Sequence, residues 1–152
     1  MTRLLVFGLC PLPTENTLKN FGPGIRAWQF IKPLLESNID VTLIAQRIPF
    51  IYPDDTPDEV VQSDGHFTYY NFSEKQFLNP HRIQDIHDDF KPTAILAATI
   101  FSSRPLKHLK TDCPIWIDLF GHVMAEAQAK VFRYQDNQFI DHFLNHEIEA
   151  LR

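Results

Sequence analysis

The stretch LLVFGLCPLPTENTLKNFGPGIR, residues 4–26, decides the fold because a run of strand length leads through a loop into glycines and a helix. Residues 4–9 are continuously apolar, which is typical of a strand covered on both faces. The loop ends at Gly22 and Gly24, and from Ile25 onward apolar residues recur at helical spacing. The stretch therefore predicts the first strand, loop and helix of an α/β domain.

The same alternation continues along the chain. Four further runs of strand length lie at residues 41–45, 67–70, 94–98 and 115–119. Two stripes of helical spacing lie between them, at Ile25, Trp28, Ile31 and Leu35 and at Phe77, Ile83, Ile86 and Phe90. Pro80 interrupts the second stripe or starts it afresh. Strands that alternate with helices predict a Rossmann-like, doubly wound, mainly parallel sheet flanked by helices.

Composition narrows the class of protein. The 152 residues fit one domain, residues 1–152, and 14 basic against 19 acidic residues give a net charge of −5. Nucleic acid is not expected as a partner, because no segment gathers lysine and arginine into a basic stripe. Cys10 and Cys113 are far apart and show no zinc or disulfide spacing, so we expect no metal site and a cytoplasmic protein.

Two further segments carry expectations. Residues 145–152 end within a helical pattern that has no stop signal, which indicates the amino-terminal part of a longer, two-domain chain. The proline-rich residues 46–57 are the longest irregular stretch, and a mobile loop and a flap over the site are both open interpretations.

The glycine-containing loop is a candidate binding site. The first free N–H groups of the following helix can bind a phosphate, a carboxylate or a sugar hydroxyl, and Arg26 adds a forked donor. We expect Gly22, Gly24 and Arg26 to face the crevice rather than the core. The alternative is that the glycines only shape a turn and Arg26 is a solvated residue of the first helical turn.

A dinucleotide site is the second interpretation of this loop. Gly22-x-Gly24-x-x-Ala27 matches the loose pattern of such sites, but about a dozen residues separate it from the first strand, where a dinucleotide fold has its first glycine. The second strand also ends without an acidic residue. Arg47 at that end keeps an NADP-linked oxidoreductase open as an alternative, and a non-catalytic interaction module is a third class.

A second constellation follows the last predicted strand. Asp118, Gly121 and His122 come at its carboxyl end, where they should line the same crevice as residues 22–26, and Glu126 shares a helical face with His122. Asp118 either orients His122 through a hydrogen bond or caps the next helix. Trp116 is expected to pack rather than to stack on a sugar.

These features together resemble the amino-terminal domain of retaining GT-B glycosyltransferases, in particular the family-4-like group. The resemblance rests on residues 4–8, the proline-bearing loop, Gly22-Pro-Gly24-Ile-Arg26 and the second strand, and it spans roughly residues 3–125. Family members typically enter the second strand through Gly-His-x-Val, whereas this chain has Asn38-Ile-Asp-Val41.

The resemblance implies a function and its partners. It implies a domain that mainly binds a sugar or glycan acceptor, while a carboxyl-terminal domain of the same parent chain holds the nucleotide-sugar donor, with no further cofactor. It also implies a catalytic role for His122 beside the donor sugar, and a helix-capping or packed histidine is the alternative interpretation of this residue. Peripheral membrane association is left open. We do not expect this chain to transfer a sugar by itself.

Overall fold

The computed structural model describes residues 2–15, 21–119, 123–135 and 137–150. Its elements are, in chain order, β1 (Arg3–Cys10), α1 (Gly22–Glu36), β2 (Asp40–Arg47), β3 (Glu59–Asp64), β4 (Phe67–Phe72), α2 (Glu74–Phe77), α3 (Pro80–Phe90), β5 (Ala94–Ala97), the 3-10 helix η1 (Ile100–His108), β6 (Ile115–Ile117), α4 (Val123–Tyr134) and α5 (Gln138–Ala150).

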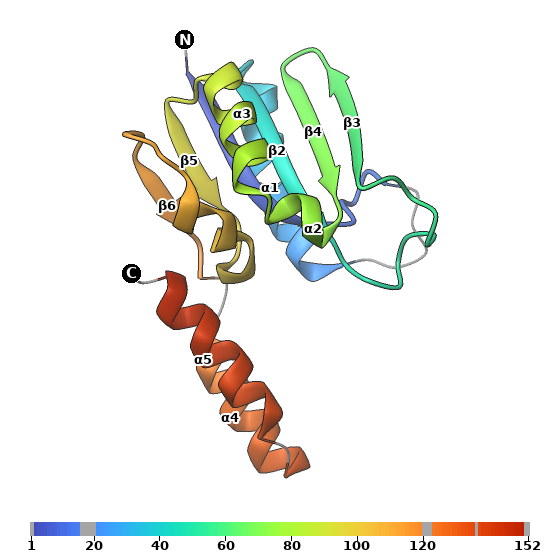
Figure 1. The fold of residues 1–152 in the computed structure, drawn as a ribbon, viewed down its shortest axis with the longest axis vertical. Coiled ribbons are helices and arrows are strands. Elements are labelled where there is room, and N and C mark those ends of the chain that lie inside the picture. Colours follow the sequence, from blue (N-terminus) through green and yellow to red (C-terminus); the bar gives the residue numbers. More distant parts are fainter. Residues whose placement is uncertain (1, 16–20, 120–122, 136, 151–152) are drawn as a thin grey trace.

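The strands form one six-stranded sheet in the order β3-β4-β2-β1-β5-β6 (Figure 1). All neighbours are parallel except β3, which pairs antiparallel with β4. The central strand β1 is in register with both neighbours, so that Val6 lies beside Leu43 on one side and Leu96 on the other. The sheet flanked by helices is the Rossmann-like α/β architecture that the sequence predicts.

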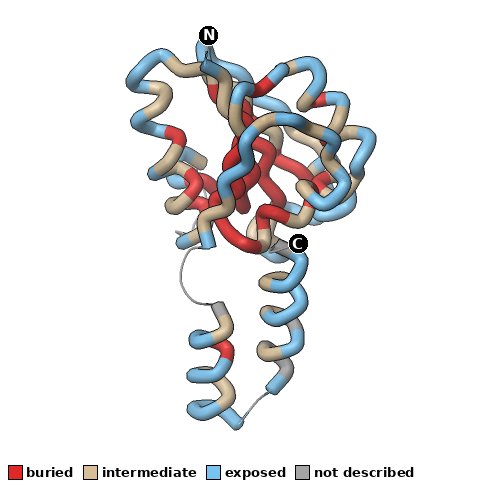
Figure 2. Tube along the Cα trace, turned by 90° about the vertical axis from the view of Figure 1, so that its left-hand side faces the viewer, coloured by how far each residue is buried: buried red, intermediate tan, exposed pale blue. Residues whose placement is uncertain are grey.

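Side chains that alternate along the strands pack into two hydrophobic cores, one on each face of the sheet. Val6, Leu43 and Leu96 pack with Ala27 and Ile31 of α1 on one face. On the opposite face, β-strand residues pack with α2 and α3, in a cluster that contains Leu5, Phe7, Ile44, Phe72, Phe77, Ile83, Ile86 and Ile95. Figure 2 shows the buried segments concentrated in the strands between the helices. This two-sided burial explains why the central strands are continuously apolar.

Local sequence features explain where the helices on the second face begin. Pro80 occupies the first turn of α3, where its missing N–H is not needed, and the Asn79 side chain caps that turn by accepting from the Arg82 N–H at 3.3 Å. Pro80 thus starts a new helix, and Phe77 belongs to the short preceding helix α2.

Two differences from the sequence-based expectations occur at the edges of the sheet. The strand β3 was not expected, because its residues EVVQSD are mostly polar and exposed, as suits an edge strand. At the other edge, β6 is shorter than the predicted residues 115–119, and the expectation that Trp116 packs is wrong, since 69% of its surface is exposed. Nothing within the described ranges lies beyond β6 to cover it.

The last two helices form a hairpin that projects from the sheet (Figures 1 and 2). Helices α4 and α5 contact each other, and α5 also contacts η1, where the rings of Phe143 and Phe101 lie 5.6 Å apart between centroids. None of the helices in the described ranges combines the length and apolarity needed to cross a bilayer.

Candidate functional site

The carboxyl ends of the parallel strands share one edge of the sheet, and the first turn of α1 meets them there. Gly24 is buried at this join, and a Cβ atom built on it would lie 1.9 Å from the carbonyl oxygen of Pro11 and 2.9 Å from its carbonyl carbon. The backbone of α1 therefore approaches the loop after β1 more closely than any side chain allows. The expectation that Gly24 faces the crevice is wrong, whereas Gly22 is exposed and has nothing within 4 Å of its Cβ position.

Arg26 and Asp118 form an ion pair at the same edge. The Nε atom of Arg26 lies 2.7 Å from Oδ2 of Asp118, although 92 positions separate them in the sequence. The pair is partly open to solvent, with 33% of the Arg26 side chain and 17% of the Asp118 side chain exposed. The hydrogen bond to Asp118 raises the pKa of Arg26 above its ordinary value.

The guanidinium group of Arg26 also makes a cation–π contact with Phe30, because its central carbon lies 4.5 Å from the centroid of the Phe30 ring. The structure thus brings together two of the predicted site residues, Arg26 and Asp118. Asp118 accepts a hydrogen bond from Arg26, a role that neither interpretation of Asp118 foresaw. Gly121 and His122 lie outside the described residues.

A pocket of about 160 Å³ adjoins this pair, and we call it the edge pocket. Its described walls come from four elements and two connecting segments, as Pro23, Thr99, Ile100, Phe101, Leu119, Glu126 and Phe143. Pro23 precedes Arg26 by one helical turn and Leu119 directly follows Asp118, so the pocket lies near the ion pair at the carboxyl edge, although neither Arg26 nor Asp118 lines it. Glu126 is an exposed helix residue that lines the pocket.

A second polar group at this edge was not foreseen, and we call it the Glu15 cluster, made of Glu15, Tyr52, Tyr69 and Asn71. Tyr69 Oη donates to Glu15 Oε1 at 2.6 Å, and Tyr52 Oη donates to Glu15 Oε2 at 2.7 Å. The Leu12 N–H also donates to Oε1 at 2.8 Å, and Asn71 Nδ2 donates to Tyr69 Oη at 3.2 Å. One carboxylate thereby joins the loop after β1, the loop after β2 and strand β4.

The Glu15 cluster is built to stay protonated at its hydroxyls. Burial, the neighbouring Cys10 and the charge of Glu15 raise the pKa values of Tyr52 and Tyr69 well above their ordinary value. Burial also raises the pKa of the Cys10 thiol to about 12. The tyrosines remain hydrogen-bond donors and the thiol remains neutral, so these groups act as a clamp rather than as nucleophiles.

Arg47 is bound to the backbone, which bears on the NADP interpretation. Its guanidinium group donates to the carbonyl oxygens of Thr56 and Asn71, each at 3.3 Å, and to that of Pro57. The same group lies 5.9 Å from the centroid of the Tyr52 ring. Arg47 and Tyr52 thus fasten residues 46–57 to the sheet, and the guanidinium group is already engaged where a 2′-phosphate would require it.

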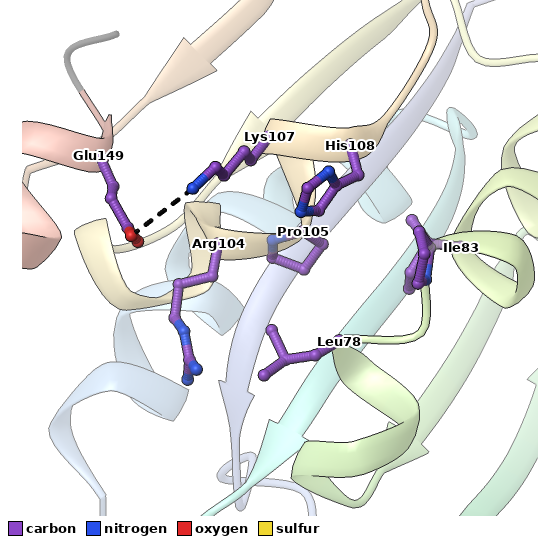
Figure 3. A pocket seen from close by; sticks show the side chains of 8 residues that line it. Leu78, Ile83, Arg104, Pro105, Lys107, His108 and Glu149 are labelled. Atoms are coloured by element: carbon purple, nitrogen blue, oxygen red, sulfur yellow. Dashed lines mark ion pairs between the residues drawn. The ribbon is translucent and has the colours of Figure 1, made fainter.

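A larger pocket of about 210 Å³ lies between η1, α3 and the end of α5 (Figure 3). It contains the basic residues Arg104, Lys107 and His108, but Lys107 Nζ lies 3.8 Å from Glu149 Oε1 and Arg104 Nη1 lies 2.9 Å from Glu74 Oε1. Since both permanent cations face carboxylates, this pocket offers little net attraction for an anion.

Among the described residues, no group of three or more His, Cys, Asp or Glu side chains is arranged to hold a metal ion. No family model, curated protein or solved structure matches this chain.

Proposed function

We propose that this chain is the acceptor-binding, amino-terminal domain of a nucleotide-sugar-dependent glycosyltransferase of the GT-B architecture. The observation that carries the proposal is the Arg26–Asp118 pair, which lies beside the edge pocket at the carboxyl ends of β1, β5 and β6. Ligands of open parallel sheets bind at this edge. The crevice therefore has the right position for a substrate in a Rossmann-like domain.

The chemistry of the pair suits a sugar hydroxyl. A hydroxyl group donates one hydrogen bond and accepts others, and Asp118 offers carboxylate oxygens that accept such a bond. Arg26 fixes the orientation of that carboxylate through its 2.7 Å contact. An acceptor held in this way would present a hydroxyl to a donor bound by a carboxyl-terminal domain, which would stabilise the departing nucleotide diphosphate.

The two other classes of function differ in their support. The NADP-linked oxidoreductase is less well supported. Its main argument was that Arg47 could bind a 2′-phosphate, but the Arg47 guanidinium group donates to three backbone carbonyls. The interaction module is favoured by one observation, the apolar outer edge of the sheet, where β6 leaves Ile115 and Trp116 exposed. An open apolar edge can pair with a strand of another chain.

Titrations followed by amide NMR test the proposal on the 152-residue chain. We expect neutral glycosides to shift the amide signals of Gly22, Arg26 and Asp118, and NADPH to leave them unchanged. Arg26→Ala should abolish the glycoside response, whereas Lys32→Ala, on an exposed position of the same helix, should preserve it.

Two outcomes would overturn the proposal. Tight NADPH binding that is lost in Arg47→Ala would favour the oxidoreductase. Dimerisation that is lost in Trp116→Lys, without any glycoside response, would favour the interaction module. In a two-domain protein that contains this chain, Arg26→Ala and His122→Ala should each lower kcat/KM by about tenfold or more.

A further inference from the structure

The edge pocket is lined mainly by apolar side chains. Five of the seven described residues that line it are apolar, namely Pro23, Ile100, Phe101, Leu119 and Phe143. The Phe101 and Phe143 rings meet at a centroid distance of 5.6 Å and an interplanar angle of 56°, so they form a tilted aromatic wall. Lys130 Nζ lies 5.5 Å from the Phe143 ring centroid. A ligand in the pocket would therefore contact aromatic and aliphatic carbon on most sides.

The volume of the edge pocket selects the size of its occupant. A cavity of about 150 Å³ lined by leucine, isoleucine and phenylalanine is large enough to bind one benzene molecule. The edge pocket measures about 160 Å³, which is the same size and a similar lining. It therefore has room for a single six-membered ring.

The polar atoms of the pocket select the charge of its occupant. Thr99 Oγ1 already accepts from the Ser102 N–H at 3.2 Å, because this hydroxyl caps η1. Glu126 is then the one charged side chain among the described lining residues, and its carboxylate accepts hydrogen bonds and repels anions. A neutral ring that carries a hydroxyl group satisfies both conditions.

We propose that the edge pocket binds a neutral, hydroxyl-bearing aromatic ring, so that the acceptor carries a phenol-type ring. This inference rests on the proposed function, since it names the class of acceptor that the crevice takes. The ring packs against the wall that Phe101 and Phe143 form, and its hydroxyl faces Glu126.

Phenol and benzoate are the probes that test this inference, with binding followed by amide NMR on the full 152-residue chain. We expect phenol to bind with a dissociation constant of about 1 mM, as suits a ligand of seven heavy atoms. Benzoate should bind about tenfold more weakly, and Glu126→Gln should remove that difference. Leu119→Trp, which fills the pocket from an exposed position, should weaken phenol binding by about tenfold.

Phe132→Ala is the matched control, because Phe132 is an exposed aromatic residue of α4 outside the pocket, and phenol binding should be unchanged in it. The inference is overturned if phenol does not bind, or if Leu119→Trp binds it as well as the parent chain does. Its failure is distinguishable from that of the proposed function: glycosides that bind through Arg26 while phenol does not would leave the glycosyltransferase proposal standing. Phenol that binds while no glycoside does would leave only the ring pocket.

Discussion

Two polar groups lie at the carboxyl edge of one sheet, and they differ in the hydrogen bonds that their carboxylates accept from the protein. In the Glu15 cluster, the carboxylate accepts from two tyrosines and a backbone N–H, and Tyr69 and Asn71 are buried. In the Arg26–Asp118 pair, the carboxylate accepts from Arg26 Nε at 2.7 Å, and both side chains remain partly exposed. Both groups contain a carboxylate beside a strand end, but the protein occupies more of the acceptor capacity of Glu15.

The comparison shows that the number of hydrogen bonds accepted from the protein decides the role of a carboxylate at such an edge. A carboxylate whose two oxygens accept several hydrogen bonds from the protein stabilises the fold and has less acceptor capacity left for a substrate. A carboxylate in a partly exposed ion pair contributes little to stability and keeps acceptor capacity for a hydroxyl group. The two groups should therefore respond differently to mutation.

The largest effect is expected where α1 meets the loop that carries Glu15. Gly24→Ala would place a methyl group 1.9 Å from the Pro11 carbonyl oxygen, and backbone cannot move away as a side chain can. We expect a loss of about 3 kcal/mol or more in the free energy of unfolding, measured by urea denaturation.

Gly22→Ala is the control for this substitution, since its Cβ position is open and its site is exposed at the start of the same helix. It should change stability by less than about 1 kcal/mol. Equal stability of the two variants would show that the close approach at Gly24 does not hold the edge together.

The next effect tests the Glu15 cluster. Glu15→Gln keeps the shape of the side chain but replaces one acceptor oxygen by an amide donor facing the hydroxyls of Tyr52 or Tyr69. We expect a loss of about 2 kcal/mol, because one of the two tyrosine hydroxyls loses its acceptor in a largely buried cluster. Glu36→Gln, at an exposed position of α1, should stay within about 0.5 kcal/mol of the parent chain. If Glu15→Gln is as stable as the parent chain, the Glu15 cluster does not stabilise the fold.

The sequence predicts the central strands correctly because strands that are buried on both faces have continuous apolar runs. Strands β1, β2 and β5 are apolar on both faces, and their continuous runs identify them without any knowledge of distant contacts. Strand β3 has no such apolar run, since it is polar and exposed at an edge. The packing predicted for Trp116 is wrong because an apolar residue on an edge strand need not be covered by other residues.

The two polar groups also differ in whether the sequence alone could predict them. Arg26 and Asp118 were placed in one crevice because the strand ends of a doubly wound sheet meet at one edge, which is a rule of topology. Glu15 lies 37 positions from Tyr52 and 54 from Tyr69, in loops whose paths follow no periodic pattern. Only tertiary structure brings these three residues together.

A smaller effect depends on pH and concerns Cys10, which is fully buried beside the Glu15 cluster. Its pKa rises from an ordinary value of 9.0 to about 12 in the folded chain. Above pH 9 the unfolded chain releases the thiol proton and the folded chain keeps it, so stability falls as pH rises. We expect a loss of about 1 kcal/mol between pH 8 and pH 10, measured by urea denaturation at each pH. This loss should be reduced in Cys10→Val and retained in Cys113→Val; an unchanged slope in Cys10→Val would contradict the assignment.

The smallest effect on stability is expected at the open pair, and it completes the contrast. A double-mutant cycle of Arg26→Gln and Asp118→Asn should give a coupling energy of about 0.5 kcal/mol, because water competes for both partners and each long side chain loses freedom in the contact. The coupling should shrink further at 1 M salt, where surface charges are screened within about 3 Å. Glycoside binding should nevertheless be lost in either single variant, since the hydroxyl partner needs an oriented carboxylate. A coupling above about 2 kcal/mol would place the pair among the structural clamps, and the distinction between the two groups at this edge would no longer hold.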